Sequence, residues 1–195
     1  MRPAKPRIDP LDEAQWDEQL QPLRELMKAL GGGRVFNIFS TVAHNPRLLK
    51  NWMVFGTHVL NKSTVPPRER ELVILRIGWL CQAEYEWAQH VVIGTLCGLT
   101  DEEIARIPSG AEAPGWSELD QLLIRASDEL HGDSCISDAT WKGLSSHYDK
   151  PQMLDLLFTA GQYTLVSMVL NSLGVELDEG LEGFPRTRAL ELRSS

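Results

Sequence analysis

Residues 68–90 read RERELVILRIGWLCQAEYEWAQH: charged residues come first, an apolar segment follows at 72–81, and polar and aromatic residues close the stretch. Pro67 precedes it, and Glu69 and Glu71 fall within the next four positions. This order is typical of a helix start, because acidic side chains oppose the positive end of the helix dipole. We therefore predict that a helix begins near Pro67.

The interior of this stretch does not show its secondary structure by periodicity. LVILRI at 72–77 is rich enough in β-branched residues to pass for a buried strand, and its context favours helix. No Gly or Pro lies between Trp79 and Ile93, so a single helix would run from about 67 to 99. Such a helix is longer than most in globular proteins. We therefore predict a hidden break near residues 81–84.

The rest of the chain also has helical signals, so the expected fold class is all-α. Asn45 and Pro46 form a helix start, and Thr100 and Glu103 have the spacing of a capping box. Gly31–Gly33 is interpreted as a helix end, because no strand precedes it and no Lys-Ser/Thr follows, as a phosphate-binding loop would need. The further predicted helices span 11–30, 45–60, 100–107, 117–131 and 151–173, with a short one around Trp141 and Leu144.

Length and composition favour one soluble domain over residues 1–195, with a core at about 11–175 and a charged tail at 176–195. The chain is 43% hydrophobic and 24% charged, as in ordinary globular proteins. We expect the tail either to wrap a neighbouring subunit or to remain mobile.

The charge and apolar patterns exclude several partners. The net charge is −8 and no dense basic cluster occurs, so we expect neither nucleic acid nor a membrane surface as a partner. The basic opening is followed by a polar acidic segment, unlike a secretory signal, and the apolar run at 72–81 is too short to span a bilayer. A cytoplasmic protein is expected.

Three cysteines, Cys81, Cys97 and Cys135, are widely spaced and form no CxxC pair. An odd set of this kind argues against a disulfide framework and against a dithiol redox centre. We interpret them as buried thiols.

Glu86 and His90 are the candidate reactive pair. They are four residues apart and so share one face of a helix, where Ala83 and Gly94 lie one turn before and after and leave room. Apolar neighbours predict partial burial, which raises a carboxyl pKa and lowers an imidazole pKa, while mutual hydrogen bonding opposes both shifts. The pair can serve proton transfer near neutral pH, or it can be a structural contact between helices.

The heptapeptide RELVILR at 70–76, the segment 81–90 and the tripeptide GQY at 161–163 resemble the carboxymuconolactone decarboxylase and alkyl hydroperoxidase D-like family. The similarity covers most of 45–175. Peroxidase members carry Glu, eleven residues, Cys, two residues, Cys, three residues and His. In this chain Glu71 and His90 match that pattern, but Ala83 and Glu86 occupy the cysteine positions. A hydroperoxidase needs a thiolate and a resolving thiol, so the peroxidase function is disfavoured.

The resemblance implies an all-α fold with a helix break ahead of His90, and homo-oligomers that are trimers or hexamers. It favours the decarboxylase branch, which needs no metal or organic cofactor and expels CO₂ from a lactone acid before protonating the carbanion equivalent. Decarboxylation, isomerisation and elimination of a small lactone or unsaturated acid all use this acid/base chemistry. By this resemblance His90 donates or accepts the proton, Glu86 orients it or is a second acid/base, and Glu71 is a carboxylate that either supports these groups from behind or relays protons.

Three further residues are candidates for binding the small-molecule substrate. Tyr85 and Trp87 are candidates for shaping the pocket, and Arg76 for anchoring a substrate carboxylate. The alternative is that the aromatic side chains belong to the core and that Arg76 is buried beside an acid.

Two other functions remain open from the sequence. Glu71, Glu86 and His90, with His58, have the donor types of a metal site in a helical bundle, although a second Glu-x-x-His pair is missing. A non-catalytic oligomeric scaffold or binding module is the other alternative.

Overall fold

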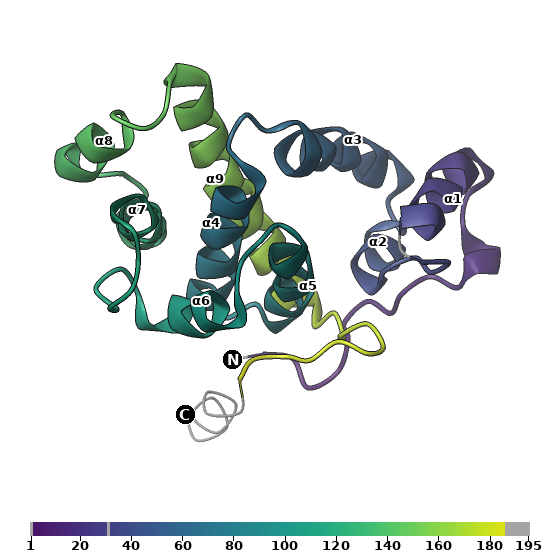
Figure 1. Cartoon of the computed structure of the whole chain (residues 1–195). Helices are drawn as coiled ribbons and strands as arrows, with labels where there is room; N and C mark the ends of the chain where they lie inside the picture. The colour runs from purple at the N-terminus through teal and green to yellow at the C-terminus, as the bar shows by residue number, and fades with distance from the viewer. Residues whose placement is uncertain (1, 31, 186–195) are drawn as a thin grey trace.

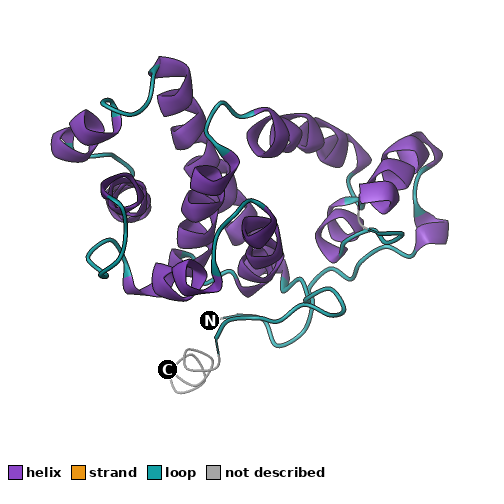
Figure 2. Cartoon of the chain, viewed as in Figure 1, coloured by secondary structure: helices purple, strands orange, loops and turns teal. Residues whose placement is uncertain are grey.

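The structure is a computed structural model that describes residues 2–30 and 32–185. All regular elements in these ranges are helical, and no strand occurs among them (Figure 2). The α-helices are α1 (Gln21–Leu30), α2 (Asn37–Val42), α3 (Pro46–Thr57), α4 (Pro67–Leu80), α5 (Glu84–Leu96), α6 (Asp101–Arg106), α7 (Glu118–Asp133), α8 (Asp138–Leu144) and α9 (Lys150–Leu173). Short 3₁₀ turns lie at Glu13–Gln15, Glu18–Leu20 and Ile107–Ser109, and a π turn lies at His58–Lys62. The predicted all-α fold is confirmed.

Helix α4 is the centre of the molecule and packs against α5, α7 and α9 (Figure 1). Its residues are buried without interruption from Arg70 to Trp79. Leu72 and Ile77 have no exposed surface. A helix that is covered on every side needs no polar stripe, which is why the sequence of α4 shows no helical periodicity.

The predicted break between the two central helices is confirmed. Helix α4 ends at Leu80, and α5 begins at Glu84. Gln82 adopts a left-handed backbone conformation with φ of 53°, and the Ala83 amide donates to the Gly78 carbonyl at 2.8 Å. The Asn171 side chain of α9 donates to the Cys81 carbonyl at 3.0 Å, so the turn is held by a partner distant in sequence.

The N-terminal region differs from its prediction. Residues 11–30 do not form one helix: two 3₁₀ turns come first, and α1 begins only at Gln21, with Pro22 in its first turn, where proline is tolerated. Trp16 and Leu20 are nevertheless buried, so their apolar character reflects packing rather than helical periodicity. Helix α2 was not predicted.

Helix α9 is apolar on two faces, only one of which is covered. Leu156 and Leu170 are buried, whereas Phe158 and Met168 are more than half exposed. Within the described ranges α9 is the one helix whose length and composition would suffice to cross a membrane, and half of its most apolar window is buried inside the protein. The prediction that this helix is central to the core holds for one of its faces.

The C-terminal segment, residues 174–185, packs against its own chain. Asp178 accepts hydrogen bonds from the Asn37 amide at 2.9 Å and from Gln89 at 2.7 Å. The Phe184 ring lies 5.2 Å from the Trp79 ring and 5.8 Å from the Trp87 ring. The part of the predicted tail from 176 to 185 therefore covers α5, while residues 186–195 lie outside the described residues.

Replacing Phe184 by alanine removes the ring that packs between Trp79 and Trp87. We expect this change to lower the free energy of unfolding by about 3 kcal/mol, at the lower end of the range for buried phenylalanines. Urea denaturation measures the difference, with Ile8→Ala as the control because Ile8 is 39% exposed. Equal stabilities for the two variants would contradict the packing role of Phe184.

Candidate active site

The site begins at Glu71, a fully buried carboxylate in the first half of α4. Its Oε2 atom lies 2.6 Å from Nδ1 of His90 on α5. Its Oε1 atom accepts hydrogen bonds from Nε and Nη2 of Arg70, at 3.2 and 3.1 Å. Each oxygen of Glu71 therefore has a partner, as a buried carboxylate requires.

The second ring nitrogen of His90 also lies against a carboxylate. Its Nε2 atom is 3.0 Å from Oε1 of Glu86, one turn earlier in α5. His90 and Glu86 are each 5% exposed. The structure thus brings together Glu71, Glu86 and His90, the three residues expected to carry the chemistry; their catalytic roles remain a prediction.

Two glycines allow α4 and α5 to approach closely at this point. A Cβ atom added at Gly78 would lie 3.8 Å from Cβ of Glu86, and one added at Gly94 would lie 3.0 Å from Leu99 and 3.7 Å from Cβ of Glu71. The room predicted beside Gly94 is thus filled by neighbouring side chains.

Electrostatics favour the protonated form of His90. Burial alone lowers its pKa, but the charges and hydrogen bonds of Glu71 and Glu86 outweigh burial and raise the pKa to about 10. With His90 protonated, the two carboxylates are balanced by Arg70 and His90, and the group of four carries no net charge. At neutral pH His90 is therefore an imidazolium.

Tyr163 of α9 completes the surroundings of His90. Its ring meets the imidazole edge-on, with 4.8 Å between centroids and an interplanar angle of 84°. Burial first, and then the charges of Glu86 and Glu71, raise the pKa of Tyr163 well above its ordinary value. The phenol therefore stays neutral and keeps a proton to donate, and no hydrogen bond within the described residues involves its hydroxyl.

The three predicted substrate-binding residues lie elsewhere. Arg76 donates to Asp128 of α7 at 2.6 Å and to the Ile107 carbonyl at 2.8 Å, so its guanidinium joins α4 to α7 and the 3₁₀ turn. The Tyr85 hydroxyl donates to Asp178 of the C-terminal segment. Trp87 stacks in the aromatic group with Trp79, 5.3 Å between ring centroids. Their contacts are those of the structural alternative, and none of them joins the Glu71–His90 group.

Two residues of the site were not assigned from the sequence. Arg70 is adjacent to Glu71 in the sequence, and adjacent residues in a helix rarely face each other. The only sequence signal for an Arg70–Glu71 ion pair was that a basic residue stands next to an acidic one. Tyr163 was visible as one of few polar residues in an apolar helix, but its contact with His90 is a tertiary property.

The three cysteines form no disulfide bond with one another. Cys81, Cys97 and Cys135 are all free. The interpretation as buried thiols is wrong for Cys135, which is exposed, while Cys81 and Cys97 are partly buried. Burial raises the pKa of Cys81 and of Cys97, which lowers their thiolate fractions. The Cys81 sulfur lies 3.6 Å from Nδ1 of His131.

The donor geometry does not suit a metal ion. Glu71 and Glu86 face opposite nitrogens of the His90 ring, so the three side chains cannot converge on one point. His58 is separate, with Nε2 3.3 Å from Asp155. Within the described ranges no group of three or more His, Cys, Asp or Glu residues is arranged to hold a metal.

Comparison with known proteins gives a family match over the middle of the chain. Residues 46–128, which hold α3 to most of α7 and all of Glu71, Glu86 and His90, match the model of the carboxymuconolactone decarboxylase family. Over these residues the chain is similar to this family. No curated protein matches the sequence.

Solved structures share the fold of this chain at low sequence identity. A variant of the debrominase Bmp8 in complex with 2,3,4-tribromopyrrole has a TM-score of 0.77 at 12% identity, over 97% of this chain and 98% of that chain. The alkylhydroperoxidase AhpD core protein from Ralstonia eutropha JMP134, a peroxidase-related protein, has a TM-score of 0.77 at 16% identity, over 90% of this chain and 95% of that one. A peroxidase-related protein from Silicibacter sp. TM1040 has a TM-score of 0.77 at 14% identity, over 91% and 95%. At these identities the likeness establishes the AhpD-like fold.

The raised pKa of His90 predicts a defined pH dependence of stability. A native pKa of about 10, against an ordinary value of 6.5, means that the folded state binds the proton more tightly. The contribution of His90 protonation to the free energy of unfolding is complete below pH 6.5 and is lost as the pH rises to about 10. Urea midpoints measured across that interval should fall in the wild type and fall much less in His90→Gln.

The matched control is His147→Gln, because His147 is exposed and lies outside the site. That variant should keep the wild-type slope. A slope in His90→Gln equal to that of the wild type would show that His90 is not the group whose proton stabilises the fold.

Proposed function

We propose that the protein is a cofactor-independent acid/base enzyme of the decarboxylase-like branch of its family, acting on a small lactone or unsaturated carboxylic acid. One observation carries this proposal: His90 lies between two carboxylates from two helices, in a buried group without net charge. A proton can pass within such a group without leaving an uncompensated buried charge.

The three residues have different roles in this proposal. Glu71 is fixed by Arg70 and has no exposed surface, so it is a positioning residue that keeps a proton on Nδ1 and orients the ring. Glu86 and His90 share the remaining proton and are the groups that meet substrate. Because His90 is an imidazolium at neutral pH, it supplies the proton while Glu86 is the base.

Decarboxylation in this site proceeds by breaking the bond between the substrate carboxylate and its neighbouring carbon. The electron pair moves into the conjugated carbonyl and forms an enolate, and CO₂ leaves. The imidazolium of His90 stabilises the enolate and then protonates carbon, after which solvent returns a proton to His90. The neutral hydroxyl of Tyr163 is a second donor for the enolate oxygen. Isomerisation uses the same groups, with Glu86 removing a proton and His90 returning one elsewhere.

The structural comparison is consistent with a small substrate. Bmp8, which shares the fold, binds 2,3,4-tribromopyrrole, a small planar ring. A small lactone acid is of similar size. The free cysteines with raised pKa values do not favour thiol peroxidase activity.

The test is an activity assay with a panel of lactone acids and unsaturated acids. Turnover is measured as CO₂ release and as a change in ultraviolet absorbance. We expect His90→Gln and Glu86→Gln to lower kcat by roughly 10²- to 10⁴-fold, the usual contribution of a positioned acid or base. His147→Gln is the control and should retain wild-type kcat. Circular dichroism checks that each variant is folded.

The competing functions give different results in the same assay. Full turnover after alkylation of the cysteines and after chelation agrees with the acid/base proposal. Unchanged kcat in folded His90→Gln contradicts it, and loss of turnover on alkylation would point to thiol chemistry instead. If no substrate in the panel is turned over and His90→Gln is only less stable, the buried group is structural and the scaffold alternative stands.

A further inference from the structure

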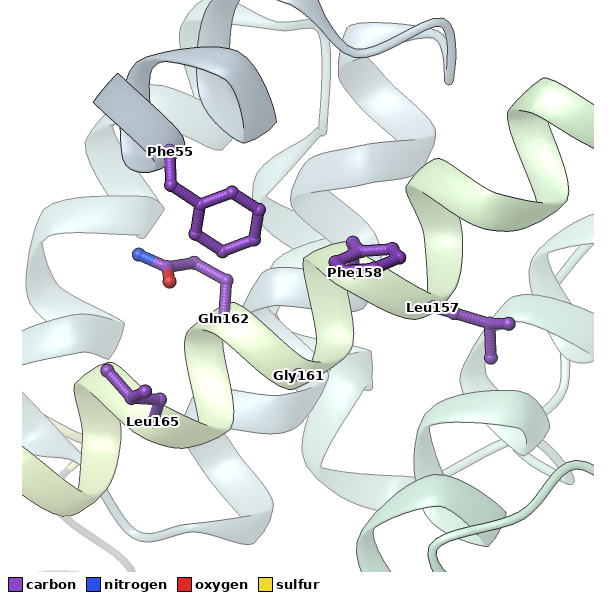
Figure 3. Close-up of a pocket in the computed structure, with 6 residues that line it drawn as sticks. All are labelled: Phe55, Leu157, Phe158, Gly161, Gln162 and Leu165. Atoms are coloured by element: carbon purple, nitrogen blue, oxygen red, sulfur yellow. The ribbon is translucent and has the colours of Figure 1, made fainter. Parts of the chain in front are cut away.

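A small pocket opens on the surface of the protein between α3 and α9 (Figure 3). Its volume is about 370 Å³, within the range of small-molecule sites. The lining residues are Phe55, Leu157, Phe158, Gly161, Gln162 and Leu165. None of them belongs to the group around His90. We call this the Gln162 pocket, after its one polar side chain.

The Gln162 side chain is a buried polar group without a partner. Gln162 is only 6% exposed. Within the described residues its side-chain amide takes part in no hydrogen bond. A buried amide that stays unpaired carries a desolvation cost, which a hydrogen bond to another molecule would offset. Because Gln162 lines the pocket, its amide is available to a ligand that enters there.

Two glycines determine the space around this amide. A Cβ atom added at Gly56 of α3 would lie 3.7 Å from Nε2 of Gln162, so the amide nitrogen lies directly against the last turn of α3. A Cβ atom added at Gly161 would meet no atom within 4 Å. The space beside Gln162 on α9 is therefore open, and Figure 3 shows the amide next to the Phe55 ring.

Two phenylalanine rings make the pocket suitable for a planar ligand. Phe55 and Phe158 lie edge-on to each other, with 6.0 Å between ring centroids and an interplanar angle of 77°. They are 37% and 56% exposed, so both retain surface that a further ring can cover. Aromatic rings pack favourably in offset and edge-on arrangements of this kind. The lining thus offers apolar contacts to a flat ring and one polar anchor at Gln162.

Charge favours a neutral ligand over an anion. The lining carries no charged side chain, and the charged residue nearest to Gln162 along α9 is an acid, Asp155. The whole chain has a net charge of −8. A carboxylate would therefore enter without a counter-charge and against the field of the protein. A side-chain amide holds an N–H donor beside a carbonyl acceptor, which a second amide can match with two hydrogen bonds.

We propose that the Gln162 pocket binds a small planar aromatic carboxamide or lactam. The amide of this neutral ligand exchanges hydrogen bonds with Gln162, which satisfies the unpaired side chain. Its ring packs against Phe55 and Phe158. Binding in this pocket uses none of Glu71, Glu86 and His90, so the proposal is independent of the function proposed for that group.

A titration followed by nuclear magnetic resonance tests the ligand class, with benzamide as the neutral probe and benzoate as an anion of the same shape. The side-chain NH₂ signals of Gln162 are identified by their loss in Gln162→Leu. We expect benzamide to shift them saturably, with a Kd in the millimolar range because the probe has few atoms. Benzoate should bind at least five-fold more weakly. The absence of a saturable shift, or equal affinities for the two probes, overturns the proposal.

Filling the pocket tests where benzamide binds, with saturation-transfer spectra of the ligand as the readout. Gly161→Leu and Gly132→Leu are matched, since both glycines are helical and a Cβ atom added at either meets no atom within 4 Å. Gly161→Leu should abolish benzamide binding, and Gly132→Leu, on α7, should keep the wild-type Kd. Wild-type binding in Gly161→Leu would place the ligand elsewhere and contradict the proposal.

Gln162→Leu separates a ligand-binding role of the amide from a structural one. It keeps an apolar side chain of similar size and removes both hydrogen bonds to benzamide, so the Kd should rise about ten-fold. The urea midpoint should not fall, because the amide loses no partner within the described residues. An unchanged Kd overturns the proposal, and so does a lowered urea midpoint, which would show that the amide serves the fold.

Discussion

The contact between Glu71 and His90 joins the two central helices. Much of the surrounding structure supplies partners that offset the cost of burying these charged groups. Burying two carboxylates and an imidazolium without water is strongly unfavourable unless each charge has a partner. Arg70 supplies one partner and Glu86 the other, so the group reaches neutrality only with all four members present. Removing one member would leave an unpaired buried charge, so the four residues depend on one another for stability as well as for any chemistry.

The turn between α4 and α5 determines whether this contact can form. It reverses the chain so that position 71 of the first helix meets position 90 of the second. Gln82 adopts a left-handed conformation there, which a residue other than glycine takes up only when its surroundings enforce it. Asn171 of α9 bonds the Cys81 carbonyl, and the aromatic group of Trp79, Trp87 and Phe184 packs at the same end of the helices. The C-terminal segment thus supports the site from a distance.

Local signals predicted the long helices and the break, because helix length and capping are properties of neighbouring residues. Helix α2 shows where this fails: Phe36 at its start makes no side-chain cap, and the Asn37 amide is bonded instead by Asp178, 141 residues away. In the site, the spacing of Glu86 and His90 was enough to pair them. Glu71 came only from the family resemblance, and the partners of Arg76, Tyr85 and Trp87 depend on helices whose packing the sequence does not reveal.

The residue at position 86 is the main support for proposing acid/base rather than thiol chemistry at this site. In the peroxidase pattern this position and position 83 are cysteines, whose thiols carry little charge until they ionise. Glu86 instead places a carboxyl group beside Nε2 of His90, on the side of the ring opposite Glu71. The imidazole between them keeps its proton to a pKa of about 10, whereas a neutral thiol at position 86 would leave only Glu71 to raise that pKa. A glutamate in place of a cysteine at this position therefore removes a thiol and at the same time favours the charged form of the histidine, which supports the proposed acid/base function.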